Sequence, residues 1–341
     1  MTQSIARLLP SNIKSLFHDR IMDRPVTVFL WIFLFIGLMV RLRSYLARIS
    51  FWVDEAALAN NLVERSLSQL IGPLDQNQVA PIGFCIIEKL LILLWGNHEY
   101  ALRFLPFLAG SFALILTYVL VKQALGKSCA LLCTAQLAVM KESIFYANNL
   151  KPYSLDLAIA LGLVLLAWPA RTLLQSKRQF WVLFLSGVAA VWFSFPALFV
   201  LAGIAMVFWY KAIKNQHWKT IVPLALISLA WVASFIIHYY LLRSGGEYDN
   251  LADAWSDRFV VLLPKTIKDI KHNSYLLYYV FRNPVWTIHP AVSIPIFLIG
   301  CALLWKNNRT FFFLILLPLV LNYFSSGLHA YPFRDRTLQY A

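Results

Sequence analysis

The sequence predicts an all-α polytopic membrane protein, and two observations lead to this class: the composition and the presence of long segments without charge. Hydrophobic residues make up 60% of the 341 residues and charged residues 13%, against roughly 45–50% and 25% in soluble proteins. So few charges do not cover the surface of a globular protein. Segments such as 26–40 and 311–320 contain no charged residue at all, as spanning helices require.

The excess of basic residues has a membrane explanation. Lys and Arg number 30 against 16 Asp and Glu, a formal net charge of +14, which in a soluble protein would suggest a nucleic-acid partner. Membrane proteins collect Lys and Arg on their cytoplasmic loops, and the sequence carries no nucleic-acid-binding motif. We therefore expect membrane lipids, and no nucleic acid, among the partners.

The apolar segments and the basic residues together predict the topology. A spanning helix needs ~20 residues, and ten apolar segments approach this length, at residues 26–42, 79–96, 101–121, 128–146, 153–169, 179–194, 196–210, 220–242, 284–304 and 310–327. If 79–96 does not cross and the N-terminus lies inside, nine spans remain. The cytoplasmic segments, which then hold 14 of the 30 basic residues, are 1–25, 122–127, 170–178, 211–219 and 305–309.

Segment 79–96 also differs from the other apolar segments in composition. Glu88 and Lys89 lie in its middle, so we expect an interfacial helix or a shallow re-entrant one. An amphipathic stretch at 57–70 precedes it and is typical of a helix on the membrane surface. The predicted organisation is a cytoplasmic tail at 1–25 and one membrane domain at 26–341, with outer loops at about 43–100 and 243–283.

Two acidic sites on the predicted outer side are the strongest candidates for chemistry. Asp54 and Glu55 follow aromatic residues that anchor the loop at headgroup depth, although two such acids also solvate a loop or cap a helix. Asp156 lies about one turn inside an apolar span, where an ionisable group is costly and usually functional. Its alternative is a buried ion pair with Lys151 or Lys141. Two carboxylates on one side of the membrane can provide a general base or bind a divalent metal.

Other polar residues give weaker signals. Gln78 belongs to a polar run that ends at a proline, a pattern that also fits a simple turn. Arg334 and Arg336 follow the last span on the predicted outer side. Two arginines there can clamp a phosphate or lie among lipid headgroups.

These elements have a familiar order. The first outer loop carries Asp54-Glu55, and the following elements are Gln76-Asn77-Gln78-Val79-Ala80-Pro81-Ile82-Gly83-Phe84, Glu88-Lys89-Leu90, Asn97-His98-Glu99-Tyr100-Ala101-Leu102-Arg103-Phe104, Tyr146-Ala147-Asn148-Asn149-Leu150-Lys151-Pro152-Tyr153-Ser154-Leu155-Asp156 and Tyr331-Pro332-Phe333-Arg334. Over nearly the whole chain, this order resembles the bacterial family 39-like, protein-mannosyltransferase-related glycosyltransferases of the GT-C fold. Members of that group use polyprenyl-phosphate-linked sugars.

The resemblance implies a GT-C-like bundle of about nine transmembrane helices and an enzyme that moves a sugar from a polyprenyl-phosphate carrier to an acceptor hydroxyl. Asp54 would be the catalytic base for in-line, inverting attack on the anomeric carbon, with support from Glu55. Asp156 matches a second acidic site of the group, at which some members bind a divalent metal. Here that metal would be Mg²⁺ or Mn²⁺, held by Asp156 with Asp54.

The chemistry of such a transfer assigns roles to the remaining candidates. A polyprenyl phosphate is a stable anion at neutral pH, so its departure requires positive charge and a base for the acceptor but no general acid. Lys151, Arg334 and Arg336 can supply the charge. Gln78 and Tyr153 lie in elements that fit the substrate site of the group.

The resemblance also implies a location and leaves other classes open. A multi-pass protein of the bacterial plasma membrane is expected, with a cytoplasmic N-terminus, an active site on the outer face, and a glycan, lipid or protein as acceptor. The alternatives are a transporter, which should show internal repeats, and a non-catalytic lipid-carrier or assembly protein, which would tolerate loss of Asp54. A Glu-Lys-Pro element is absent at 79–81, so an aminoarabinose donor is not supported. Relatives usually continue through further helices after residues 331–333, so a C-terminally truncated member is expected.

Overall fold

The computed structural model describes residues 11–168, 176–243, 255–282, 289–338 and 340, with side chains from Arg24 on except those of residues 335 and 336. Within these ranges every regular element is helical, which confirms the predicted all-α class. The α-helices are α2 (Ser11–Leu46), α3 (Val53–Glu64), α4 (Ile82–Trp95), α5 (Glu99–Leu125), α6 (Lys127–Val139), α7 (Lys141–Tyr146), α8 (Tyr153–Ala167), α9 (Lys177–Phe193), α10 (Ala197–Lys214), α11 (Ile221–Arg243), α13 (Ile267–Arg282), α14 (Pro290–Asn307) and α15 (Arg309–Gly327).

Six of the described helices are long and apolar enough to cross a membrane. They are the Arg24–Leu46 part of α2, α5, α10, α11 with the short turn before it, α14 and α15. The membrane class predicted from the sequence is therefore supported. Helices α6 and α8 are apolar but shorter, and α4, which covers most of segment 79–96, has 14 residues and is not among the six.

The apolar segment expected at 128–146 is broken into two helices. Helix α6 ends at Val139, Met140 is extended, and α7 begins at Lys141. The carbonyls at a helix end lack partners within the helix, and here a buried arginine of α2 provides them. Arg41 donates to the Leu137 oxygen at 3.0 Å and to the Ala138 oxygen at 3.3 Å, so two carbonyls at the break have a side-chain partner.

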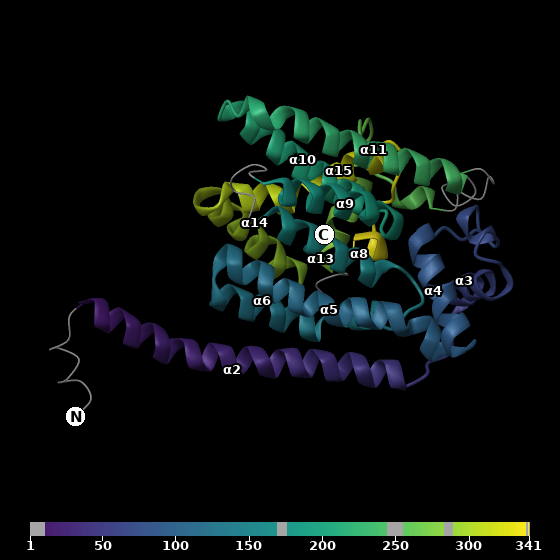
Figure 1. Ribbon diagram of the computed structural model, residues 1–341, viewed down its shortest axis with the longest axis horizontal. Coiled ribbons are helices and arrows are strands. Elements are labelled where there is room, and N and C mark those ends of the chain that lie inside the picture. Colours follow the sequence, from purple (N-terminus) through teal and green to yellow (C-terminus); the bar gives the residue numbers. More distant parts are fainter. Residues whose placement is uncertain (1–10, 169–175, 244–254, 283–288, 339, 341) are drawn as a thin grey trace.

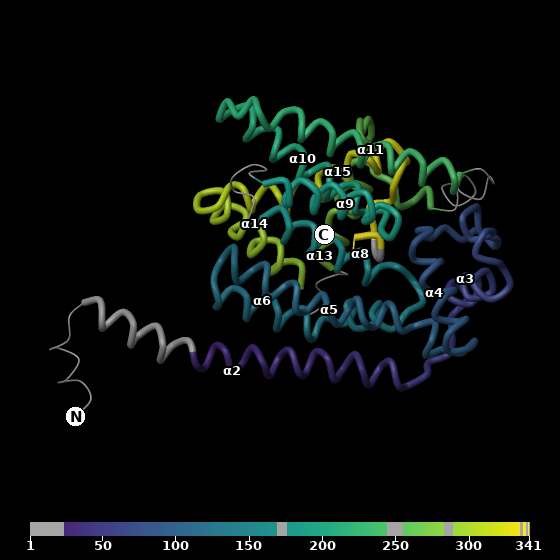
Figure 2. Tube along the Cα trace, viewed as in Figure 1, coloured from purple at the N-terminus to yellow at the C-terminus, as the bar shows by residue number. Residues whose placement is uncertain are grey.

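The helices form an elongated bundle with α3 and α4 at one end (Figure 1). Helix α2 runs along one side of the bundle against α6, and α5 packs between α6 and α8. Helices α9, α10, α11 and α15 pack with α8 around the largest apolar core, which includes Leu163, Leu201, Trp231 and Phe311. The trace in Figure 2 shows the coloured part of α2 running along one side of the bundle.

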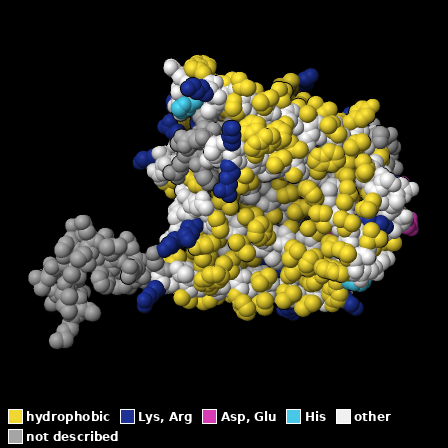
Figure 3. All heavy atoms as spheres, viewed as in Figure 1, with side chains coloured by type: hydrophobic (Ala, Val, Ile, Leu, Met, Phe, Trp, Pro, Cys, Tyr) yellow, Lys and Arg dark blue, Asp and Glu magenta, His cyan; other side chains and the backbone are white. Residues whose placement is uncertain are grey.

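The surface of the bundle is that of a lipid-facing protein. Leu226, Leu229 and Ile236 of α11 are each more than half exposed. Figure 3 shows one face of the molecule, where hydrophobic side chains form most of the surface and many Lys and Arg side chains gather toward the end that carries the N-terminus. A wide apolar band of this kind is costly in water and favourable in a bilayer.

A smaller apolar core fixes the end of the bundle at which the sequence places its acidic loop. Leu58 and Leu62 of α3 pack with Phe84 of α4, Leu102 of α5 and Leu150 before α8, all of them almost fully buried. The amphipathic stretch expected at 57–70 is thus partly the helix α3, whose apolar side is covered by protein. This core holds together the three chain segments from which the candidate site is built.

Candidate functional site

Three polar side chains from distant parts of the chain meet at the end of the bundle formed by α3 and α4. Asp54 pairs with Lys151, with 3.1 Å between Oδ1 and Nζ, and Gln78 donates to the same Asp54 oxygen at 3.2 Å. Lys151 in turn donates to the Gln78 Oε1 at 2.6 Å. We call Asp54, Gln78 and Lys151 the polar cluster. All three were predicted as site residues from the sequence.

The local backbone structure determines the position of each member of the polar cluster. Asp54 lies in the first turn of α3, where a carboxylate is favoured by the helix dipole. Gln78 follows a turn in which Gln76 and Asn77 have positive φ angles of 61° and 54°. Lys151 lies two residues before α8 and is 6% exposed. A buried ammonium therefore faces a carboxylate that remains partly open, with its side chain 26% exposed.

A second, fully buried ion pair holds this arrangement in place. Arg103 of α5 donates from Nη2 to both carboxylate oxygens of Glu55 at 3.1 Å and from Nε to Oε1 at 3.3 Å. The Glu55 Oε1 also accepts the backbone N–H of Leu150 at 2.7 Å. Glu55 therefore connects α3 and α5 to the residue that immediately precedes Lys151, and it positions Asp54 and Lys151 relative to each other.

Arg103 was not predicted as a site residue. It also donates to the Ile49 carbonyl and lies over the Phe51 ring, with 4.5 Å from Cζ to the ring centroid. In the sequence it stands near the start of an apolar segment, where an arginine commonly lies at the membrane surface. Its partner Glu55 distinguishes Arg103 from such a surface arginine. The fold, and not the sequence, shows that the two residues lie together.

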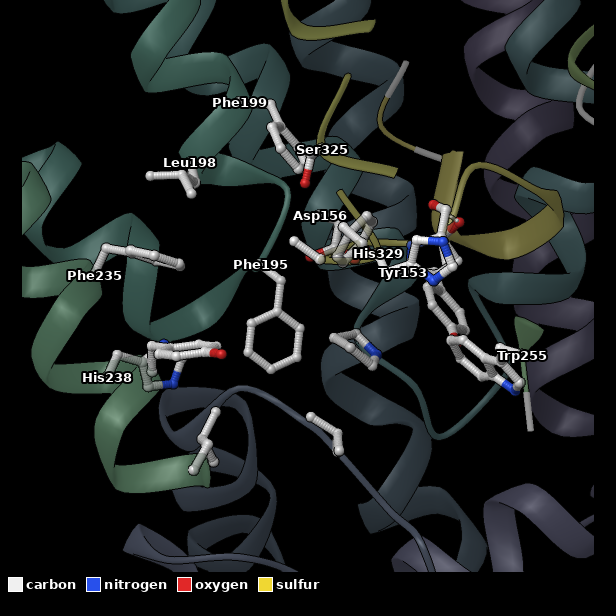
Figure 4. A pocket seen from close by; sticks show the side chains of 18 of the residues that line it. Tyr153, Asp156, Phe195, Leu198, Phe199, Phe235, His238, Trp255, Ser325 and His329 are labelled. Atoms are coloured by element: carbon white, nitrogen blue, oxygen red, sulfur yellow. Dashed lines mark hydrogen bonds between the residues drawn. The ribbon is translucent and has the colours of Figure 1, made fainter. Parts of the chain in front are cut away.

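A large, mostly apolar cavity lies next to the polar cluster, between α8, α10, α11 and the segment after α15. Its volume is about 380 Å³, and Lys151 forms part of its wall. Aromatic side chains dominate the lining (Figure 4). The wall includes Tyr153, Phe195, Phe199, Phe235, Tyr239, Trp255, Phe259 and Tyr331.

Asp156 lines the same cavity from the first turn of α8. Asp156 is 4% exposed, and its Oδ1 is buried with no hydrogen-bond partner among the described residues. Ser194 lies within hydrogen-bonding reach of the carboxyl group. The alternative of an ion pair with Lys151 is not what is seen, because Lys151 pairs with Asp54.

His238 is a second residue whose role the sequence did not indicate. Its Nε2 accepts the backbone N–H of Ile82 at 3.2 Å, so it ties α11 to the first turn of α4. The ring lies against Trp192 and Phe195, with centroid distances of 5.2 and 5.6 Å, and it lines the cavity. His238 thereby holds the segment that carries Gln78 at the cavity edge.

The arginines of the C-terminal segment are placed differently from the polar cluster. Arg334 pairs with Asp257 at 3.0 Å and lies over the Tyr275 and Tyr279 rings of α13. It is not among the residues found to line the cavity. The side chain of Arg336 lies outside the described part of the chain, so its predicted contact with a phosphate stays a prediction.

Among the described residues, no three His, Cys, Asp or Glu side chains form a group that could hold a metal ion. Asp54 is engaged by Lys151 and Gln78. The Mg²⁺ or Mn²⁺ expected from the resemblance stays a prediction, and no step below is routed through it.

Helix α4 contains one further buried acid, away from the cavity lining. Glu88 is fully buried, and neither of its carboxyl oxygens has a hydrogen-bond partner among the described residues. Removal from water disfavours the charged form, and burial raises the pKa of the Glu88 carboxyl well above its usual range. Burial therefore favours the neutral form of Glu88.

Comparisons of the chain with protein-family models, with curated proteins and with solved structures find no match. The site must accordingly be interpreted from its own geometry.

The contact between His238 and Ile82 leads to a test of how α4 is held. His238→Phe should lower stability by about 1–3 kcal/mol, because it leaves a buried N–H without its acceptor. His238→Gln should lower it less, since the Gln oxygen can reach the position of Nε2. The measurement is the thermal unfolding of both purified variants. A smaller loss for Phe, which keeps an aromatic ring, than for Gln would show that ring packing, and not the hydrogen bond, matters.

Proposed function

We propose that this chain is a membrane glycosyltransferase of GT-C type that transfers a sugar from a polyprenyl-phosphate carrier to an acceptor hydroxyl. One observation carries the proposal: Lys151 pairs with the candidate base Asp54 and at the same time forms part of the wall of an apolar cavity. A cation and a base are thereby adjacent at the mouth of a site suited to a lipid. Those are the groups that this transfer requires.

Asp54 is the base in the proposed reaction. Its carboxylate is held at Oδ1 by Lys151 and Gln78, and the partial exposure of the side chain allows an acceptor hydroxyl to approach. The hydroxyl gives its proton to Asp54 as its oxygen attacks the anomeric carbon. The bond from that carbon to the phosphate oxygen breaks, and the configuration is inverted.

Lys151 stabilises the leaving group. When the donor binds, its phosphate competes with Asp54 for the Lys151 ammonium. This weakens the Asp54–Lys151 pair and makes Asp54 a better proton acceptor. The released polyprenyl phosphate is a stable anion, so no acid is needed to protonate it.

The cavity provides the site for the carrier. Burial of an isoprenoid contributes about 0.8 kcal/mol per CH₂ group, and the aromatic wall offers apolar surface for the first isoprene units. The cavity volume is within the usual range for a ligand site, ~300–1,000 Å³. The rest of the chain of the carrier would remain in the bilayer, beside the exposed apolar helices.

The proposal includes the nine-span topology. The N-terminus is cytoplasmic, α4 lies at the outer interface, α6, α8 and α9 cross together with the six longer helices, and the polar cluster faces the outer side of a bacterial plasma membrane. The broken segment α6–α7 and the short α8 are tolerated because irregular backbone inside a membrane protein is buried or lines a cavity.

Sugar transfer from a lipid donor is the direct test of the proposed function. Membranes that contain the full-length chain should transfer labelled sugar from extracted polyprenyl-phosphate sugar to endogenous acceptor, and membranes without the chain should not. Nucleotide sugar given in place of the lipid donor should support no transfer in carrier-depleted membranes. Transfer that depends on the nucleotide sugar alone would contradict the proposal, whereas lipid binding without any transfer would favour a carrier protein.

The topology gives a separate expected result. In a variant with its four cysteines replaced, single cysteines at Asp75 and Asn97, on either side of α4, should both react with an impermeant thiol reagent in intact cells. A cysteine at Gln216, after α10, should react only after lysis. All three positions are exposed, so protection reports sidedness. Opposite labelling of Asp75 and Asn97 would mean that α4 crosses the membrane.

A further inference from the structure

Asp156 is a buried carboxyl group with an unsatisfied oxygen in the wall of an aromatic cavity. Oδ1 has no partner among the described residues, and the only side chain found in hydrogen-bonding reach of the carboxyl is Ser194. Burying a polar group without a hydrogen bond costs free energy, and burying a charge costs more. An uncompensated acid is retained more readily where a ligand supplies its partner.

Three other polar side chains of the cavity wall are held by protein groups other than Asp156. His238 accepts the N–H of Ile82 through Nε2. Thr337 donates its hydroxyl to the Pro332 and Arg334 carbonyls. Lys151, the basic residue of the wall, is engaged by Asp54 and Gln78. The carboxyl group is thus available for a group that enters the cavity.

The position of Asp156 relative to Lys151 suggests what that group is. Lys151 lies two residues before α8 and Asp156 is in the first turn of α8, so one small headgroup can reach both residues, one with each end. A ligand with a phosphate at Lys151 presents its sugar toward Asp156. A carboxylate accepts hydrogen bonds from hydroxyl or ammonium groups and offers none itself. The surrounding rings, labelled in Figure 4, provide the apolar faces on which a sugar ring can lie.

We propose that Asp156 recognises the sugar of the donor, by accepting a hydrogen bond from a hydroxyl or amino group of that sugar. This inference rests on the proposed function and deepens it. It assigns to one residue the discrimination between a carrier that bears a sugar and a carrier that has lost it. Asp156 touches the substrate but takes no part in the bond changes. A carrier that has lost its sugar leaves Oδ1 without a partner and is bound less tightly.

The test compares binding of carrier with and without sugar to purified full-length protein. The probes are undecaprenyl phosphate and its glucosyl, galactosyl and mannosyl esters, with affinities measured by native mass spectrometry. At least one ester should bind more tightly than undecaprenyl phosphate itself. Asp156→Leu, which keeps the approximate size of the side chain but removes both oxygens, should weaken binding of that ester ~10–100-fold, because the sugar group loses its acceptor, and should change binding of undecaprenyl phosphate less than about threefold.

Glu88→Leu is the matched control, because Glu88 is also a buried acid with unpartnered oxygens but is not found in the cavity wall. It should leave all affinities unchanged. An Asp156→Leu variant that still prefers the ester would overturn the inference and indicate that water satisfies Oδ1. Equal weakening for the ester and the free carrier would overturn it as well. If the unaltered protein binds no probe, the proposed function itself fails.

Discussion

The replacement Asp54→Asn should reduce the rate of sugar transfer by at least ~10²–10⁴-fold, the usual contribution of a general base. Asn has the size of Asp, and its amide oxygen can still accept from Lys151 and Gln78, which hold Oδ1 at 3.1 and 3.2 Å. It cannot accept a proton at neutral pH. The chain should therefore fold and bind the lipid donor while transfer is lost.

The matched control is Asp269→Asn. Asp269 also lies in the first turn of a helix and accepts the N–H groups of Lys265 and Thr266 at 3.0 Å, and it is not among the residues found to line the cavity. Transfer is measured with labelled sugar on the lipid donor at equal amounts of folded protein. Turnover of Asp54→Asn equal to that of Asp269→Asn would remove Asp54 as the base.

The second large effect is expected on stability. Arg103→Met should lower the free energy of unfolding by about 3–5 kcal/mol, because removing one member of a buried ion pair leaves the other charge without compensation. Glu55 would be that charge, in a pair whose side chains are only 5% and 3% exposed. The loss should be visible as a lower unfolding temperature of the purified protein.

Two further variants separate charge from geometry. Arg103→Lys keeps the positive charge but not the forked contact with both carboxylate oxygens, so an intermediate loss is expected. The double variant Arg103→Met, Glu55→Leu removes both charges and should be more stable than Arg103→Met alone. A double variant less stable than either single one would contradict the account of a mutually compensated pair.

Much of the fold follows from local sequence properties. Charge-free apolar segments predicted the helical membrane class, because lipid-facing helices need continuous apolar residues. The break at Met140 was not predicted, since it leaves the apolar character of 128–146 unchanged and depends on Arg41 of another helix. Helix α13 was also missed within the expected outer loop. Only some of its residues are apolar, and its buried side packs against distant residues: Leu276 and Phe333, for example, belong to one apolar cluster.

In the candidate site too, local sequence predicted some features, whereas others depend on contacts between distant residues. The sequence predicted each member of the polar cluster as a site residue. Gln78 lies 24 positions after Asp54, and Lys151 lies 73 positions after Gln78, so their contact follows only from the fold. Arg103 and His238 were missed, because their partners are a distant acid and a backbone N–H. Sequence patterns indicate which residues are costly to bury. They do not indicate which distant group compensates them.

The central claim, that Asp54 activates an acceptor hydroxyl for direct attack on a lipid-linked sugar, is tested most directly by the anomeric configuration of the product. Purified full-length protein is given a polyprenyl-phosphate sugar of defined configuration, and the transferred sugar is examined by nuclear magnetic resonance. A single in-line displacement predicts complete inversion, with β-linked donor yielding α-linked product. Retention of the donor configuration would require a covalent intermediate or a second displacement and would contradict the account.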